Sequence, residues 1–560
     1  MTNLPSTSRQ SGDSPRTLID ELLAEQQELT AVEKVSRAHA QVGLRGELYR
    51  ELLPATPPAP GQQYAFEVDL DKCTGCKACV SACHSLNGLD DNETWRSVGL
   101  LVGDPAQDYR ARRGAAAFQQ NVTTACHHCV DPGCLNGCPV LAYDKDAVTG
   151  IVRHLDDQCI GCQYCVMMCP YEVPQYSKAR GIVRKCDMCH SRLSVGEAPA
   201  CVQACPTSAI KITVIEQAKV RGKYRQLSSF NFQPTVTVTA TPNIFLPSSP
   251  NPAITLPSTR FVTTRTLPEN LFAGDDSVVR PAEAHLPLVI LLTLSQLAVG
   301  ASIAAVFVEP ASPLLLVALV AGVVALVAGS LHLGQPCKAW RSFLGWRKSW
   351  FSREVIALGA FVFLIGLALV ARWLLVVESL TLLLAGFAAL TGLATVTCSS
   401  MIYVKTRRDF WSASQSFPKF LGTTLLLGAA TTMVTSSFAN PAENDLIASA
   451  ITLLVATLVK LAVERRIFTH LVDEETPAQT PLNKSARLLG GKLNGFVRGR
   501  IALGVLGGVI FPLMLMGQTA PAISMLAVVA AGLCLAGELF ERYLFFAAVV
   551  TQKMPGGVAS

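Results

Sequence analysis

The chain has 560 residues, of which half are hydrophobic, a mean hydropathy of +0.36 and a formal net charge of +6 at pH 7. The apolar residues gather in 286–550, whereas 1–285 is polar. This division excludes a single soluble globule and indicates a soluble head followed by a membrane domain. Of the nineteen cysteines, sixteen lie between residues 73 and 205 in C-x-x-C groups, which favours metal ligation over disulfide bonds.

Residues 1–60 are predicted to form an N-terminal arm. Residues 1–15 are polar, and from 16 to 39 leucines and valines recur at roughly helical spacing. This pattern predicts an amphipathic helix, which either packs on the head or docks a partner subunit. The stretch "LPATPPAPG" (53–61) is interpreted as a proline linker.

The predicted head, 61–215, carries four cysteine groups. The first and third have the spacing C-x2-C-x2-C-x3-C of bacterial two-cluster ferredoxins, in which three cysteines hold one cube and the fourth reaches a neighbouring cube. Sixteen thiolates therefore predict four [4Fe–4S] clusters. His127 and His128, inside the second group, are expected to be structural rather than ligands. The groups are Cys73, Cys76, Cys79 and Cys83; Cys126, Cys129, Cys134 and Cys138; Cys159, Cys162, Cys165 and Cys169; and Cys186, Cys189, Cys201 and Cys205.

Zinc and haem are the alternatives for these cysteines. Zinc also binds C-x-x-C pairs, but its sites rarely need four cysteines at such short spacing. Cys186, Cys189 and His190 spell C-x-x-C-H, the attachment motif of a c-type haem. A haem there would leave Cys201 and Cys205 without a role and remove the fourth cluster. The iron–sulfur interpretation is therefore preferred.

Residues 216–285 are rich in serine, threonine and proline, which does not suit a central strand and predicts an extended tether. The domain 286–550 then contains eight apolar segments, each about the length that a helix needs to cross a bilayer. The predicted fold is an α+β four-cluster head, resembling a double dicluster ferredoxin, joined to an all-α bundle of eight transmembrane helices. The segments are expected at 286–308, 314–333, 354–375, 380–402, 420–439, 446–463, 501–518 and 522–541.

Basic residues mark one side of the membrane domain. The connections between segments 2 and 3, 4 and 5, and 6 and 7 hold sixteen lysines and arginines, whereas the alternate connections hold only Arg372. Because positively charged loops stay in the cytoplasm, both termini and the head are expected on the cytoplasmic side of the inner membrane. The opening residues have neither an apolar signal core nor a twin arginine, in agreement with this orientation.

Several motifs carry a family resemblance. The stretches "CIGCQYCVMMCPYEVPQY" (159–176) and "KCDMCHSRLSVGEAPACVQACPTSAI" (185–210) resemble the iron–sulfur subunit of dimethyl sulfoxide reductase. The stretches "LHLGQPCKAWR" (331–341), "SWFSRE" (349–354), "CSSMIYVKTRRDFW" (398–411) and "GELFERYLFF" (537–546) resemble its membrane anchor subunit. The resemblance covers about 60–560 and implies a fusion of two subunits that usually occur as separate chains.

The resemblance also implies how the cysteines share their clusters, which spacing alone leaves open. Groups one and four pair, and so do groups two and three. The implied sets are Cys73, Cys76 and Cys79 with Cys205; Cys186, Cys189 and Cys201 with Cys83; Cys126, Cys129 and Cys134 with Cys169; and Cys159, Cys162 and Cys165 with Cys138.

A quinol is the expected electron donor, because the predicted helices lack a pair of histidines for a haem b. Quinol oxidation releases two protons, and His332 and Glu354, at matching ends of segments 2 and 3, are candidate acceptors. The alternative is that they cap or begin helices. The resemblance points to both residues as quinol-site residues. Arg353 and Tyr403 are added as weaker candidates.

Three further expectations concern the anchor. Glu538 and Arg542, four residues apart, are weaker site candidates or a structural salt bridge. Only Lys460 and Glu538 lie well inside predicted spans, which disfavours an ion pump, because a pump needs a file of ionisable groups. The three remaining cysteines are expected to be inert small apolar residues: Cys337, Cys398 and Cys534.

The chain has no evident Ser-His-Asp set or phosphate loop, so no substrate-converting site is expected in it. The resemblance implies a separate catalytic subunit with a molybdenum–bis(pterin guanine dinucleotide) cofactor, which receives electrons from quinol through the four clusters. The alternative is a cytoplasmic sulfite dehydrogenase or another relative that delivers electrons to quinone. Membrane lipid is the other expected partner, and no nucleic acid is expected.

Overall fold

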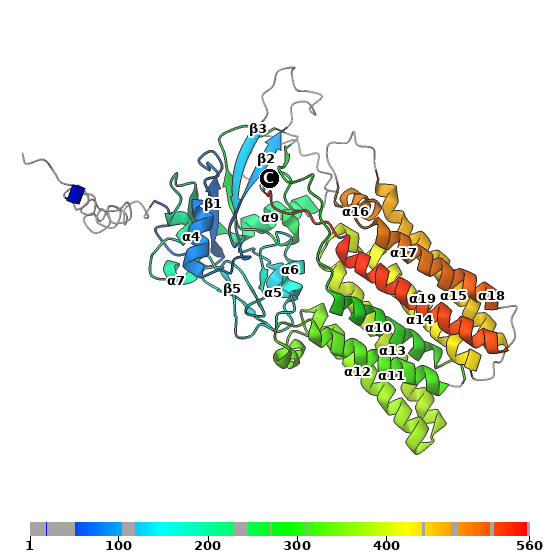
Figure 1. Cartoon of the computed structure of the whole chain (residues 1–560). Coiled ribbons are helices and arrows are strands. Elements are labelled where there is room, and N and C mark those ends of the chain that lie inside the picture. Colours follow the sequence, from blue (N-terminus) through cyan, green and yellow to red (C-terminus); the bar gives the residue numbers. More distant parts are fainter. Residues whose placement is uncertain are drawn as a thin grey trace, which may run out of the picture. The chain divides into compact units, whose positions relative to one another are not determined.

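The computed structural model describes residues 18–19, 51–103, 118–228, 245–268, 271–309, 311–438, 443–471, 480–515 and 520–556. Residues 56–560 form one compact unit. The arm predicted over 1–60 lies almost wholly outside the described residues. Figure 1 shows short strands and helices in the N-terminal half and long helices in the C-terminal half.

Two three-stranded sheets frame the head. In the first, β1 pairs antiparallel with β8 and parallel with β9; in the second, β2 lies between β3 and β10. Residues of β1 alternate in burial because successive side chains point to opposite faces. Two short hairpins, β4–β5 and β6–β7, complete the strands. Their bounds are β1 Gln62–Asp69, β2 Ser97–Gly103, β3 Phe118–Thr124, β4 Tyr143–Lys145, β5 Val152–His154, β6 Gln175–Ser177, β7 Ile182–Arg184, β8 Ile210–Glu216, β9 Arg260–Val262 and β10 Leu271–Ala273.

Short helices of the head begin within or beside the cysteine groups. The longest of them, α4, ends at Gly88, whose φ of 52° gives the left-handed cap that glycine adopts readily. Four of these helices contain cysteines of the groups, and the remaining one, α7, begins directly after Cys189. The helices are α4 Ala78–Asn87, α5 Gly133–Gly137, α6 Tyr164–Met168, α7 His190–Leu193 and α8 Ala200–Gln203.

The segment expected to be an extended tether, 216–285, differs from that expectation. Its first part forms helix α9 (Gln217–Ser228), and its later part contributes β9 and β10 to the head sheets. Both are edge strands, the position at which a proline-rich segment can join a sheet without losing ladder hydrogen bonds. Much of the segment is therefore part of the head.

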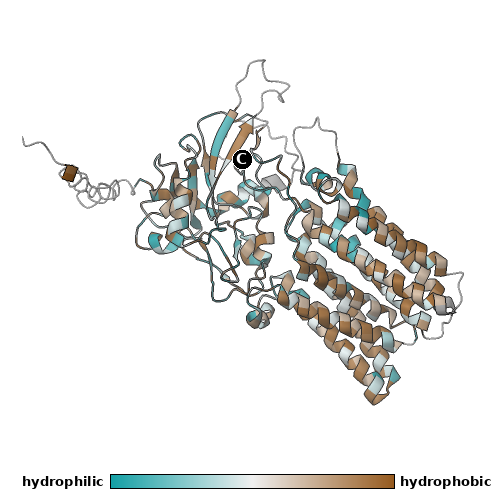
Figure 2. Ribbon diagram, viewed as in Figure 1, coloured by the Kyte–Doolittle hydropathy of each residue, from teal (hydrophilic) through white to brown (hydrophobic). Residues whose placement is uncertain are grey.

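The C-terminal half contains eight helices that are long and apolar enough to cross a membrane, counted over the described residues. This confirms the eight predicted segments, and Figure 2 shows hydrophobic residues along their length. One span is interrupted by π-helical turns between α17 and α18. The helices are α10 Leu286–Ala304, α11 Ala311–Leu331, α12 Trp350–Val370, α13 Glu378–Val404, α14 Ala413–Phe438, α15 Glu443–Arg465, α17 Asn494–Val505 with α18 Phe511–Leu515, and α19 Ala520–Ala547.

Helices α10 and α14 approach each other closely through glycines. A Cβ on Gly300 of α10 would stand 2.8 Å from the Cα of Gly428 in α14. Small residues allow such contact between membrane helices, which associate by close packing rather than by the hydrophobic effect. This contact joins α10–α13 to the later helices.

After α19 the polypeptide returns to the head. Met554 is buried in the head core, and the Leu100 amide of β2 donates to the Gly556 carbonyl at 3.0 Å. Lys553 forms an ion pair with Asp275 at 2.7 Å. One buried cluster of apolar side chains also runs from the part of the head between Cys134 and Val183 into the bundle, so head and bundle share part of their core.

Candidate iron–sulfur and quinol sites

Each cysteine group contains a loop that turns sharply at the same place. The residue before the second cysteine has a positive φ in all four groups: 77° at Gly75, 38° at His128, 69° at Gly161 and 60° at Met188. This left-handed backbone suits glycine and costs other residues about 1–3 kcal/mol. A turn repeated four times, twice with strain, indicates loops shaped around a bound group.

One cavity of the head is lined by thiols from two groups. Cys126, Cys129 and Cys134 come from the second group and Cys169 from the third. Burial raises the pKa of Cys129 well above its usual value, and the charges of the other three thiols raise it further. Such thiols ionise together only beside a positive partner, which iron would supply.

The first and fourth groups also meet. Burial raises the pKa of Cys73, and the neighbouring charges of Cys79, Cys205 and Cys76 raise it further. Cys205, the last cysteine of the fourth group, therefore lies beside the first three cysteines of the first group.

The remaining cysteine of the first group has the complementary environment. Burial and the charge of Cys201 raise the pKa of Cys83 to about 12, and Cys189 adds to the effect. Burial raises the pKa of Cys186 well above its usual value, and the charges of Cys126, Cys83 and Cys201 raise it further. Cys186 and Cys189, the pair of the possible haem motif, thus lie with two other thiols.

The third group gathers around Cys138 of the second group. Burial raises the pKa of Cys165 well above its usual value, and Cys162, Cys138 and Cys159 raise it further. The four sets are those that the family resemblance implies. They are named here the first set, Cys73, Cys76, Cys79 and Cys205; the second set, Cys83, Cys186, Cys189 and Cys201; the third set, Cys126, Cys129, Cys134 and Cys169; and the fourth set, Cys138, Cys159, Cys162 and Cys165.

The four sets follow one another in a file. Thiols of successive sets are close enough to influence each other's ionisation, or they share one neighbour, Tyr143. The contacts are Cys79 with Cys201, Cys186 with Cys126, and Cys134 with Cys165 across Tyr143. This arrangement suits a relay of redox centres.

Two buried cations lie between the sets. Arg96 donates to Thr123 Oγ1 at 3.2 Å, but its Nε and Nη2 have no hydrogen-bond partner among the described residues. Burial opposes its charge, yet the thiols, led by Cys201, raise the pKa of Arg96. Lys185 donates to the carbonyls of Val152 and Cys186. No carboxylate in the described ranges pairs with either cation, which fits a negatively charged iron–thiolate core.

The positions of the thiols can also be compared with those that a zinc site needs. No three Cys, His, Asp or Glu side chains in the described ranges converge tightly enough to hold one metal ion. A single zinc draws its ligands to about 2.3 Å, whereas a cube spreads four thiolates over its corners. The sets therefore fit [4Fe–4S] clusters better than zinc.

The two histidines of the second group have hydrogen-bonding roles. His127 Nδ1 lies 2.9 Å from Thr259 Oγ1, and burial, with the charge of Arg96, lowers the pKa of His127 to about 3. His128 Nδ1 accepts from the Val152 amide at 3.1 Å. Both side chains brace the loop from behind.

The fourth set lies against the anchor. The loop after α11 packs on it glycine to glycine, because a Cβ on Gly161 would stand 2.9 Å from the Cα of Gly334. The Gln335 amide donates to the Ile160 carbonyl at 3.0 Å. His332, buried beside this loop, hydrogen-bonds to the backbone of Cys162 and lies edge-on to His285. The predicted quinol-site histidine thus touches a cluster loop.

Tyr164 lies between the fourth set and the anchor. Its hydroxyl donates to the Ile402 carbonyl of α13 at 3.1 Å, and its ring stacks on Phe351 of α12. Burial raises the pKa of Tyr164, and the charges of Glu354 and Cys162 raise it further. Tyr164 is therefore close to both a cysteine of the fourth set and the predicted quinol-site acid.

The other three residues predicted for the quinol site differ in their surroundings. Glu354 is buried in α12 and accepts a hydrogen bond from Ser399 of α13. Tyr403 is buried four residues further along α13, packed on Trp411 and Phe545. Arg353 donates to the carbonyls of Trp346 and Arg347 instead of Glu354. The structure thus gathers His332, Glu354 and Tyr403 near the fourth set and directs Arg353 to the preceding loop.

The expected Glu538–Arg542 salt bridge is replaced by other pairs. Glu538 pairs with Lys460 and with Arg500 at 2.8 Å. Arg542 donates to Gln296 and Thr423 at 2.9 and 3.0 Å, and lies 3.4 Å from Glu541. Glu538 thus finds its cations on neighbouring helices, whereas the carboxylate beside Arg542 is Glu541 of the same helix.

Comparisons with known proteins agree with this geometry. Residues 64–85 match the 4Fe-4S binding domain family, 118–215 the 4Fe-4S dicluster domain family, and 282–548 the DMSO reductase anchor subunit family. The B subunit of the anaerobic dimethyl sulfoxide reductase of Haemophilus influenzae is 36% identical over 188 residues, which are 33% of this chain and 88% of that protein. The same-named subunit of Escherichia coli K12 is 35% identical over 189 residues, 34% of this chain and 90% of that protein.

The chain belongs to the dimethyl sulfoxide reductase family. It is an iron–sulfur subunit fused to a membrane anchor, as the motifs predict. The likeness of the iron–sulfur part reaches further: the iron-sulfur subunit of the nitrate-inducible formate dehydrogenase of Escherichia coli K12 is 39% identical over 168 residues, 28% of this chain and 57% of that protein.

Sequence reasoning missed several residues of this family member. Tyr164, Arg96 and Lys185 have no special spacing in the sequence, and only the fold brings them to the thiols. A search for basic residues close to the cysteine groups could have found Lys185, which precedes Cys186.

Proposed function

We propose that the protein carries electrons between a membrane quinol and a separate molybdenum catalytic subunit. Four [4Fe–4S] clusters, held by the first to fourth sets, supply the one-electron relay when bound. The observation that carries the proposal is the file of four thiol sets that ends against the anchor at His332 and Tyr164. The first set, furthest along this file, would then lie nearest the partner subunit.

The predicted quinol site combines a buried acid with a route to the fourth set. Glu354 and the Ser399 hydroxyl form a polar pair inside an apolar bundle, a suitable place to receive a proton from a quinol hydroxyl. His332 would hold or take the second proton, while packing around Tyr403 excludes water. Arg353 would then contribute by fixing the loop before α12.

Variants of the anchor test the quinol proposal. Glu354→Gln and His332→Arg should abolish quinol-dependent reduction of the clusters while leaving all four EPR-active. Glu378→Gln, an exposed acid at the other end of the bundle, is the matched control and should behave as wild type. Full quinol activity in both site variants would refute the site, and loss of the EPR signals would show a folding defect instead.

We further propose that the head and both termini of the chain are cytoplasmic. An even number of spans returns the polypeptide to its starting side, and the basic connections lie on that side. Protease added to right-side-out vesicles should leave the head intact and should digest it in inverted vesicles. The reverse result would move the head to the outer side.

A cytoplasmic head is also compatible with electron transfer in the opposite direction, because a cytoplasmic sulfite dehydrogenase would deliver electrons to quinone. The discriminating experiment uses the whole complex. Cluster reduction by quinol supports the reductase direction, whereas reduction by sulfite, followed by quinone reduction, supports the dehydrogenase.

A further inference from the structure

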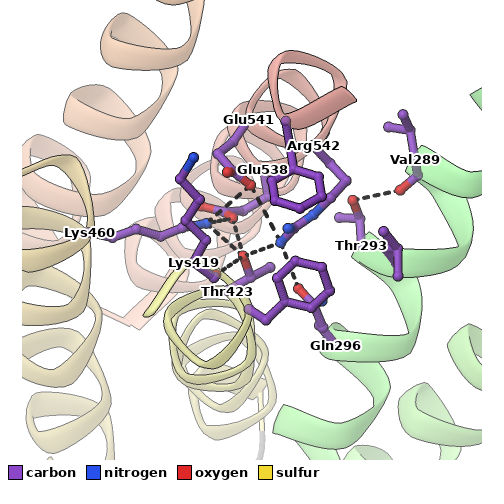
Figure 3. Close-up of polar contacts among 12 residues, drawn as sticks. Val289, Thr293, Gln296, Lys419, Thr423, Lys460, Glu538, Glu541 and Arg542 are labelled. Carbon is purple, nitrogen blue, oxygen red and sulfur yellow. Dashed lines mark hydrogen bonds and ion pairs between the residues drawn. The ribbon is translucent and has the colours of Figure 1, made fainter. Parts of the chain in front are cut away.

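A network of buried charges lies at the end of the bundle that adjoins the head, where Arg542 packs on Phe420 and Phe545, the rings that also contact Tyr403. Lys460 of α15 pairs with Glu538 of α19, and both bind the Thr423 hydroxyl of α14. Arg542 joins this hydroxyl to Gln296 of α10 (Figure 3). Ionisable groups so far inside a membrane domain are rare and default to a functional role.

Every carboxylate of the network already has cationic partners. Glu464 accepts two hydrogen bonds from Arg500, at 2.9 and 3.1 Å. Glu541 lies 3.4 Å from Arg542 and 3.7 Å from Lys460. Each carboxylate of this described network thus lies within 3.8 Å of two cations, although Glu541 Oε2 accepts no hydrogen bond from a described residue.

A cavity beside the network contains a cation without such a partner. It is enclosed by α14, α15, α17 and α19, and Lys419 of α14 lines it. Lys419 is only 6% exposed, and no hydrogen bond or ion pair joins its ammonium to another described residue. The ammonium lies 4.6 Å from the centre of the Phe410 ring. In Figure 3 the Lys419 side chain lies beside the network.

The charges around the cavity do not balance. Three cations, Lys419, Arg465 and Arg500, line it together with two carboxylates, Glu464 and Glu541, which leaves one positive charge in excess. Arg500 Nη1 is buried without a hydrogen-bond partner among the described residues. Because an uncompensated buried charge is costly, the cavity is built for an anion.

Apart from these cations, Glu464 and Glu541, the walls of the cavity are mostly apolar. Leu461, Val497, Ile501 and Leu544 line it, and Arg465 is exposed at its rim. Apolar walls contribute nothing to the binding of a small soluble anion. A molecule with a charged head and a hydrocarbon tail matches both the basic and the apolar parts of the cavity. A neutral quinone would leave the excess positive charge without a partner.

We propose that this cavity binds the phosphate headgroup of an acidic phospholipid from the leaflet that adjoins the head. Basic pockets between membrane helices are suited to such headgroups. The phosphate would lie among Lys419, Arg465 and Arg500, with acyl chains along α15 and α17. A proton channel is a poorer explanation, because the stretches 420–439, 446–459 and 501–537 contain no Asp, Glu, Lys, Arg or His.

The site would also bear on the docking of the head. Ile467 and Phe468 of the turn after α15, and Leu489 of α16 (Pro481–Gly490), line the cavity. The same helix α16 contacts the head, because Lys484 bonds Asp276 at 2.5 Å. A bound lipid would therefore stabilise the element that connects bundle and head.

The test uses the full chain in detergent, titrated with phosphatidylglycerol and, separately, phosphatidylcholine, with bound lipid counted by native mass spectrometry. Lys419→Gln should weaken phosphatidylglycerol binding about tenfold, equivalent to ~1.4 kcal/mol. The control Lys405→Gln removes an exposed lysine at the neighbouring end of α13 and should leave binding unchanged. Arg465→Gln, on the exposed rim, provides a second variant if Lys419→Gln does not fold.

Three results would overturn the proposal. Equal binding of the two lipids would show that binding does not depend on the charge of the headgroup. Unchanged binding in both variants would place the lipid elsewhere. Displacement of phosphatidylglycerol by millimolar inorganic phosphate would assign the cavity to a free anion. Preferential phosphatidylglycerol binding, lost in the two variants and kept in Lys405→Gln, would support it.

Discussion

The head and the anchor each bury several charged or ionisable groups, but they balance them differently. In the anchor, carboxylates and cations from different helices neutralise one another, as Glu538 and Lys460 do. In the head, thiols of the first three sets lie close to Arg96 and Lys185, and no carboxylate in the described ranges pairs with these cations. The head is therefore electrostatically complete only with its cofactors, whereas most of the anchor network is complete by itself.

The largest expected effect is the loss of a cluster ligand. Cys205→Ser should change the EPR signal of the same cluster as Cys73→Ser, because both thiols belong to the first set. Cys83→Ser should change the signal that Cys189→Ser changes. Each variant should lose up to a quarter of the roughly 16 iron atoms expected for four cubes.

EPR spectra and iron analysis of the four variants check this prediction. If Cys73→Ser and Cys83→Ser altered one and the same cluster, neighbouring cysteines of one group would share a cube, and the assignment of the four sets would be wrong.

In the anchor, Glu538→Gln should be the most damaging single change. It leaves Lys460 and Arg500 without their shared carboxylate, and breaking a buried pair by removing one partner costs about 3–5 kcal/mol. Thermal unfolding in detergent measures the loss. Asp445→Asn, near the other end of α15, is the control, and equal melting of the two variants would contradict the assigned role.

Removing a buried charge from the head should change the reduction potentials of the clusters more than the stability of the protein. Arg96→Gln removes the cation between the first and second sets, so both clusters should become harder to reduce, by roughly tens of millivolts. EPR-monitored redox titration measures these reduction potentials. The control is Arg221→Gln, which changes an exposed arginine of α9. A shift confined to the third and fourth clusters would contradict the position of Arg96.

The smallest effect is expected at the C-terminal tail. Lys553 is 48% exposed in its ion pair with Asp275, and such surface pairs contribute about 0–1 kcal/mol. Lys553→Gln should therefore change the melting temperature little, although it should speed proteolysis of the tail. A loss of several kcal/mol would show that the tail is held mainly by this pair rather than by buried Met554.

The parts of the fold that the sequence predicts are those with a local signal. Cysteine spacing indicates cluster loops, and runs of apolar residues indicate eight helices, because each signal lies within about twenty residues. The roles of β9 and β10 depend on contacts with distant strands, and no local pattern carries that information.

The sequence alone predicts too few buried charges in the anchor, for a related reason. Lys419, Arg500 and Arg542 lie at or just beyond the ends of the predicted apolar segments, where charges usually meet water. The helices continue past those ends, and the fold buries all three side chains. The quinol-site candidates can be found because helix-end placement and motif resemblance are both readable from the sequence.

The path of residues 549–556 has a consequence for assembly. The polypeptide enters the membrane from the head at Leu286 and comes back to it after Ala547, with the Gly556 carbonyl accepting from the Leu100 amide. One covalent connection before Leu286 and the non-covalently docked tail together keep anchor and head at a high effective concentration, so release of the tail leaves the covalent connection in place. A cell that makes this single polypeptide always produces relay and anchor in equal numbers, and only the catalytic partner has to be matched in supply.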